Sequence, residues 1–143
     1  MRVVVPFAAG GPADFVARLP GQKLSEAWEQ PVVVDNRGGA GGNLGTVLVA
    51  QAPGDGYTVL LTTSVFISNP SLYRKPGYDA FNDFVPITLA GVSATVVSRH
   101  PPYTAVKSMQ DMVRQSKLAP VNYASPGIGT AGHLAAELFR NLT

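Results

Sequence analysis

The stretch Arg2-Val3-Val4-Val5-Pro6-Phe7-Ala8-Ala9-Gly10-Gly11-Pro12-Ala13-Asp14 decides the fold. Its β-branched run predicts a buried strand over residues 2–7. Pro12 suits the first position of a helix, and Asp14 places a carboxylate in the first turn, where the helix dipole favours negative charge. The stretch therefore predicts a strand, a glycine-rich turn and a helix. Backbone N–H groups at such a helix start bind anions without a charged side chain.

Two further stretches, residues 32–42 and residues 121–130, repeat this pattern of an apolar run followed by glycines. Around them we predict strands over residues 31–36 and 57–63 and a short helix over residues 44–52. The first helix should kink or break at Pro20-Gly21, because proline removes a backbone donor. The order β-α-β-α-β is typical of a parallel sheet with right-handed crossovers.

The remaining chain has weaker patterns. Residues 69–84 are predicted to be a long polar and aromatic connection. Further strands are expected at residues 85–90, 95–98 and 121–124, and helices at residues 107–117 and 134–142. His100-Pro101-Pro102 interrupts regular structure. We therefore expect a first α/β lobe over residues 1–100 and the start of a second, incomplete lobe over residues 101–143.

Composition excludes several classes of function. Hydrophobic residues make up 45% of the 143 residues, which is enough for a core, and the net charge is only +2. Such a weak, dispersed charge argues against nucleic-acid binding. The absence of cysteine excludes disulfides, thiolate catalysis and Cys-based zinc sites. No apolar run approaches the roughly 20 residues of a membrane helix. The sequence starts almost at the first strand, so if the native protein is secreted we expect this sequence to start after its signal peptide.

Conventional catalytic motifs are few. Residues 127–132 match G-x-G-x-x-G, which leaves a nucleotide-dependent α/β enzyme as the alternative function, although the acidic residue expected about 20 positions later is missing. His133 and Glu137 share a helix face without a third metal ligand. Ser125 is better placed as a hydrogen-bond donor than as a nucleophile, and Asp14 is either a general base or a helix cap. Residues 62–64 end a parallel strand, where α/β sheets bind ligands.

Several ordered motifs together resemble one known family, the substrate-binding proteins of tripartite tricarboxylate transporters (the Bug or TctC family). The motifs are residues 3–14, the Pro-Val-Val-Val-Asp-Asn-Arg of residues 31–37 with the glycines of residues 39–42 and Asn43, residues 55–58, Asn69-Pro70 with Leu72-Tyr73, Asp83-Phe84 with Pro86-Ile87, residues 122–125, Gly127, Gly129 and Thr130, and residues 133–135. The resemblance covers essentially the whole chain.

The resemblance implies a non-enzymatic periplasmic protein of the type II binding-protein fold, without a cofactor or metal. Two α/β lobes would close on a small carboxylate and deliver it to a membrane permease. The ligand-binding residues that it implies are Phe7, Ala8, Ala9, Gly10, Gly11, Asp14, Thr63, Ser64 and Val65 in the first lobe, and Ser125, Gly127, Gly129, Thr130 and His133 in the second.

The chain also departs from this family, whose members are much longer. Most of the second lobe and the strands that complete the first are missing, so we expect a truncated chain. Gly38 stands where proline is common. We therefore expect two copies to associate, by exchanging the segment after Pro102, so that exposed strands are covered.

Overall fold

The computed structural model describes residues 1–98 and 106–142, and the chain forms two compact units, Met1–Val92 and Ser93–Thr143. The predicted boundary at His100-Pro101-Pro102 lies outside the described residues. None of the helices in the described ranges combines the length and the apolar character that crossing a membrane requires.

The first unit is built on a three-stranded parallel sheet. Strands β1 (Arg2–Val5), β2 (Val33–Asn36) and β3 (Thr58–Leu60) have the spatial order β2-β1-β3. In the register, Arg2 of β1 lies between Val33 of β2 and Thr58 of β3. The predicted parallel α/β fold is thus confirmed.

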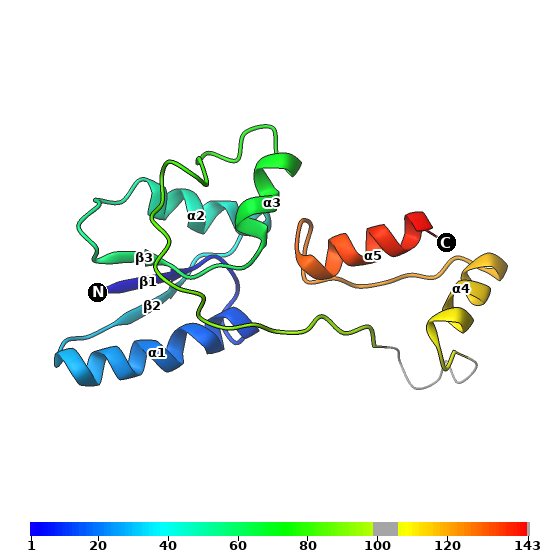
Figure 1. Ribbon diagram of the computed structural model, residues 1–143, viewed down its shortest axis with the longest axis horizontal. Coiled ribbons are helices and arrows are strands. Elements are labelled where there is room, and N and C mark those ends of the chain that lie inside the picture. Colours follow the sequence, from blue (N-terminus) through cyan, green and yellow to red (C-terminus); the bar gives the residue numbers. More distant parts are fainter. Residues whose placement is uncertain (99–105, 143) are drawn as a thin grey trace. The chain divides into compact units, whose positions relative to one another are not determined.

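Helices cover both faces of this sheet. Helix α1 (Pro12–Trp28) packs on β1 and β2, while the short helix η1 (Ala40–Gly42), α2 (Asn43–Ala50) and α3 (Val65–Leu72) lie on the opposite face (Figure 1). Under α1, Val3, Val5 and Ala17 form a buried cluster. The connection through α1 leads from β1 to β2 on one side of β1, and the connection through α2 leads from β2 to β3 on the other side. The space between β1 and β3, at their carboxyl ends, is therefore a topological switch point.

Helix α1 corrects the predicted break at Pro20-Gly21, since it continues through both residues. The reason lies in tertiary packing. A Cβ built on Gly21 would lie 3.6 Å from Val34 and 3.7 Å from Val32, so the helix backbone rests closely against the chain that leads into β2. This contact keeps the helix continuous although Pro20 supplies no backbone donor.

Three predicted strands do not form. Residues 85–90, 95–98 and 121–124 have no regular secondary structure, because no other described residues pair with them and a strand needs a hydrogen-bonded neighbour. The connection expected from residue 69 instead continues α3, which contains Pro70. Phe66 of α3 stacks on Tyr78, and Phe84 meets both rings edge to face. The Tyr78 hydroxyl donates a hydrogen bond to the carbonyl of Phe66 at 2.8 Å.

The described part of the second unit contains α4 (Met109–Leu118) and α5 (Ala131–Leu142), as the sequence predicts to within a few residues. Ser108 caps α4 by accepting a hydrogen bond from the backbone of Asp111. The extended segment before α5 is fastened to it, since the Tyr123 hydroxyl donates to Glu137 at 2.5 Å.

Candidate ligand-binding site

The loop that follows β1 lies at the carboxyl edge of the sheet and leads directly into α1. Phe7 is half-buried, whereas Ala8, Ala9 and Gly10 are exposed. Gly10 has a φ of +81°, a conformation that glycine adopts without steric cost. Helix α1 begins at Pro12 without a side-chain cap, so its first turn presents unpaired backbone N–H groups at this edge. The predicted residues 7–11 therefore form an exposed loop above a helix start.

Asp14 holds this loop through a hydrogen bond with Gly10. It is 3% exposed, and its Oδ2 accepts hydrogen bonds from the Gly10 backbone at 2.8 Å and from Arg18 Nε at 3.0 Å. The hydrogen bond from Arg18, followed by those from Gly10 and Asn36, outweighs burial and lowers the pKa of Asp14 from 3.8 to about 2. Asp14 is thus ionised at neutral pH and lies in the first turn of α1, but it accepts from the Gly10 N–H and from Arg18 and does not cap the helix.

The second glycine stretch supports the first. A Cβ on Gly38 would lie 3.5 Å from the backbone of Phe7 and Ala8. Gly42 lies equally close to Pro6 and Val65. Behind it, Asn69 is buried and donates to the carbonyl of Gly41 at 2.9 Å. Residues 38–42 therefore pack directly against the segments that follow β1 and β3.

The third predicted segment follows β3. Thr63 and Ser64 are exposed, and their carbonyls accept the first hydrogen bonds of α3, from Phe66 at 3.1 Å and Ile67 at 3.2 Å. Val65 is 1% exposed, so its side chain packs inward, while Thr63 and Ser64 before it are exposed and carry hydroxyls. Val65 and Pro6 flank Gly42, so the loops after β1 and β3 lie on either side of the switch point.

In the second unit, residues 125–130 form a turn that leads into α5. Gly127 and Gly129 have φ values of +140° and +84°. The Thr130 hydroxyl donates to the carbonyl of Gly127 at 2.7 Å and accepts from the backbone of His133 at 3.3 Å. His133 Nδ1 accepts from the backbone of Gly129 at 3.3 Å. Thr130 and His133 therefore shape this turn from within, while the half-buried Ser125 stands at its start.

A strand should precede the turn if residues 127–132 bound a dinucleotide. Residues 120–125 form none. His133 and Glu137 share a helix face, as the sequence indicates, and the described ranges hold no group of three His, Cys, Asp or Glu residues suited to a metal. Glu137 instead pairs with Arg140 at 2.6 Å and with Tyr123.

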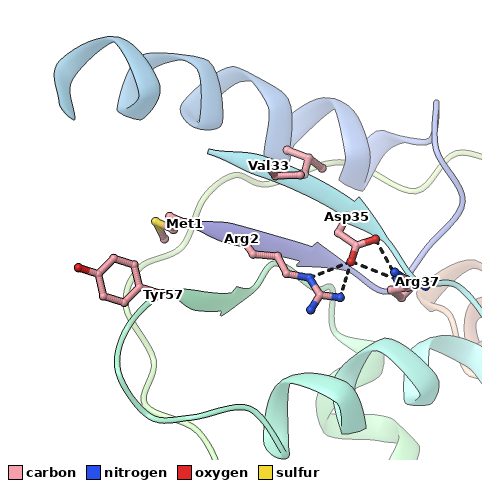
Figure 2. Close-up of a pocket in the computed structure, with 7 residues that line it drawn as sticks. Met1, Arg2, Val33, Asp35, Arg37 and Tyr57 are labelled. Atoms are coloured by element: carbon pink, nitrogen blue, oxygen red, sulfur yellow. Dashed lines mark hydrogen bonds and ion pairs between the residues drawn. The ribbon is translucent and has the colours of Figure 1, made fainter. Parts of the chain in front are cut away.

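A separate hollow of about 530 Å³ lies beside β2 (Figure 2). Arg2 and Arg37 both bind the carboxylate of Asp35, with Nε distances of 2.8 Å and 2.9 Å. Burial opposes ionisation of Asp35, but these hydrogen bonds outweigh it and lower its pKa. Met1 and Tyr57, at the amino ends of the strands, complete the lining, and no predicted site residue takes part. The hollow is therefore distinct from the candidate site.

Sequence reasoning missed two residues that hold the site together. Asn36, at the end of β2, donates to the carbonyl of Phe7 at 3.2 Å. Arg18 binds Asp14 and also donates to Asn36 Oδ1 at 3.4 Å. The i, i+4 spacing of Asp14 and Arg18 was a usable signal. Asn36 offered none, since its contact with Phe7 arises only when β1 and β2 pair.

Comparisons with known proteins identify the family of this chain. The family model described as "Tripartite tricarboxylate transporter family receptor" (TctC) matches residues 16–142. The chain is 38% identical to a UPF0065 protein from the tcbD-tcbE intergenic region of Pseudomonas sp., covering 94% of this chain and 40% of that protein. It is 35% identical to BugT of Bordetella pertussis, covering 98% of this chain and 44% of BugT.

Solved structures give the same result. The periplasmic binding protein BugD superposes with a TM-score of 0.79 at 34% identity over 99% of this chain and 48% of BugD. An R. palustris protein solved with adipate superposes with a TM-score of 0.85 at 37% identity, over 100% of this chain and 48% of that protein. The chain thus spans less than half the length of these relatives. It belongs to the tripartite tricarboxylate transporter receptor family.

Proposed function

We propose that this chain forms part of a periplasmic solute-binding protein that captures a small carboxylate for a tripartite tricarboxylate transporter. The observation that carries the proposal is the loop of residues 7–11, which presents backbone donors at a helix start beside the switch point of a parallel sheet. Family membership and the adipate-bound neighbour support this assignment. In the proposed role the protein carries out no reaction and delivers its ligand to a membrane permease.

The ligand carboxylate is proposed to bind the exposed backbone of Ala8 and Ala9 together with the hydroxyls of Thr63 and Ser64. These groups border the switch point from the ends of β1 and β3. Asp14 does not contact the ligand in this arrangement, because its charge would repel an anion and its Oδ2 is already bound to Gly10 and Arg18. We propose that it fixes the loop instead.

Within the second unit, we propose the turn of residues 125–130 as a further carboxylate-binding element. Its glycines hold positive φ angles, and α5 begins directly after it. The Ser125 hydroxyl and the N–H groups in the first turn of α5 are proposed to bind carboxylate oxygens. Thr130 and His133 keep the turn in this shape through their hydrogen bonds with Gly127 and Gly129.

Isothermal titration calorimetry tests the proposal. Adipate, citrate and a panel of shorter dicarboxylates are titrated into the chain, with NADH as the probe of the alternative nucleotide-dependent enzyme. We expect at least one carboxylate to bind and NADH to give no heat. Binding of NADH without any carboxylate would reverse the assignment, and the matched variant Ser125→Ala should weaken carboxylate binding if the second turn takes part.

We also propose that two copies of this chain associate. Val85, Ile87 and Leu89 are 75–88% exposed although their alternation is typical of a half-buried strand. Exposed, unpaired segments of this kind are ready to pair with another chain. A second copy supplies an identical segment, which closed two-fold symmetry allows to pair reciprocally.

A further inference from the structure

The loop of residues 7–11 is held at both of its ends by side chains from other positions. At its start, Asn36 Nδ2 donates to the carbonyl of Phe7 at 3.2 Å. At its end, the backbone N–H of Gly10 donates to Asp14 Oδ2 at 2.8 Å. The two anchoring side chains come from β2 and α1, which belong to different layers of the fold.

Arg18 joins these two anchors. Its Nε donates to Asp14 Oδ2 at 3.0 Å, and its Nη2 donates to Asn36 Oδ1 at 3.4 Å. A continuous series of hydrogen bonds therefore runs from the Phe7 carbonyl through Asn36, Arg18 and Asp14 to the Gly10 amide. The planar guanidinium suits this position, because its donors leave in fixed directions towards two acceptors.

Charge supports the same arrangement. The Asp14 side chain is 5% exposed and its pKa is low, so it carries a negative charge directly under the loop. An anion approaching the loop would be repelled by an unpaired carboxylate at this place. Arg18 compensates the charge of Asp14 while its own side chain remains 55% exposed.

We propose that Arg18 and Asn36 are positioning residues for carboxylate binding, which hold residues 7–11 in the binding conformation by fastening both ends of the loop. This inference rests on the proposed function of the same site. Holding a binding loop in shape before the ligand arrives lowers the entropic cost of binding. Neither residue needs to contact the ligand.

Two measurements on Arg18→Gln and Asn36→Ala test the proposal. Calorimetry with adipate, or with the best carboxylate of the panel, should show affinity falling about tenfold in each variant, the effect of losing roughly one loop-ordering hydrogen bond. Amide hydrogen exchange followed by NMR should show faster exchange at Gly10 in both. Arg18→Lys, which keeps the ion pair with Asp14 but loses the planar bridge to Asn36, should bind with intermediate affinity.

Lys23→Gln is the matched control, since Lys23 forms an i, i+3 ion pair with Glu26 on the same helix, away from the loop. It should leave both affinity and Gly10 exchange unchanged. Unaltered affinity in Arg18→Gln and Asn36→Ala would overturn the proposal, as would unaltered Gly10 exchange. If the unmodified chain binds no carboxylate, the proposed function fails, while Gly10 exchange still decides whether Arg18 and Asn36 fasten the loop. Asn36→Ala keeps the test open if Arg18→Gln does not fold.

Discussion

Gly45 occupies a position in α2 where no side chain fits. A Cβ built there would lie 2.8 Å from the Arg37 carbonyl and 2.9 Å from both Cα and Cβ of Pro6. Its neighbours are mainly backbone atoms, which cannot move aside as the end of a flexible side chain can. The first turn of α2 therefore packs directly against Pro6 and Arg37, the residues that follow β1 and β2.

Gly45→Ala should lower the free energy of unfolding by about 1–3 kcal/mol, because overpacking forces backbone shifts. Gly54→Ala serves as its control, since a Cβ at Gly54 meets nothing within 4 Å. Urea denaturation followed by circular dichroism measures both. Equal stability of the two variants would show that the Gly45 contact is looser than these distances indicate.

Asp14 predicts a specific response to acid. Its pKa in the folded chain is about 2 against an ordinary value of 3.8, so ionised Asp14 stabilises the fold above pH 4. This contribution is lost as the pH falls towards 2. Asp14→Asn should therefore be less stable than the unmodified chain by a constant amount above pH 4, and the difference should shrink below it. Denaturant midpoints between pH 2 and 7 test this, and a difference independent of pH over the whole range would refute it.

At the scale of elements, α1 links the candidate binding loop to the sheet. Its first turn follows the loop of residues 7–11, and its later turns pack on β2. Pro20 lies inside it and is exposed, while Pro12 lies at its first position. The helix tolerates Pro12 at its first position, whereas Pro20 removes a backbone hydrogen bond to the preceding turn.

Pro20→Ala should raise the free energy of unfolding by about 1–3 kcal/mol, since it restores a backbone donor in the helix interior. Pro12→Ala should change the stability little, because the first helical position has no intrahelical partner for its N–H. Thermal unfolding of both variants makes the comparison. A stabilising Pro12→Ala with a neutral Pro20→Ala would contradict it.

The elements also show how far sequence reasoning reaches. Strands β1 and β2 could be predicted because each apolar run ends in a glycine-rich turn, and β3 because its apolar run follows the turn residues 53–56. The strand at residues 121–124 was wrong because pairing depends on a neighbour that the pattern cannot reveal. Helix α3 was missed because Asn69-Pro70 suggests a turn, whereas buried Asn69 is fixed by Asn43 and Gly41 from a distant part of the chain.

The same reasoning applies to the site. Asp14 could be placed in the first turn of α1 because the start of a helix is a local feature, but its hydrogen bonds with Gly10 and Arg18 were not predicted. The role of Asn36 depends on the pairing of Val5 with Asn36 in the sheet, which brings it to the loop after β1. Local chemistry could therefore be predicted, but the fastening of the loop could not.

At the scale of the whole molecule, the two units are joined by a stretch with unusual chemistry. Residues 84–98 contain no charged residue, and Val96 and Val97 are 79% and 67% exposed. The chain as a whole therefore carries a long uncharged apolar surface, which is the basis of the proposed pairing of two copies.

Ile87→Glu should shift the chain from dimer to monomer, since two copies would then bring like charges together. Ile67→Glu is the matched control, because Ile67 is 54% exposed but lies in α3, outside this segment. Sedimentation velocity at several protein concentrations distinguishes the species. A monomeric mass for the unmodified chain at all concentrations would exclude the proposed association.

The same uncharged stretch has a consequence for the handling of the protein. Short β-prone segments without charges are the usual starting points of aggregation, and charged gatekeeper residues normally flank them. Between residues 84 and 98 only Pro86 and Gly91 interrupt such a segment. Thr95→Lys should therefore raise the yield and slow aggregation during storage, since a charge at that position opposes stacking of one chain on the next.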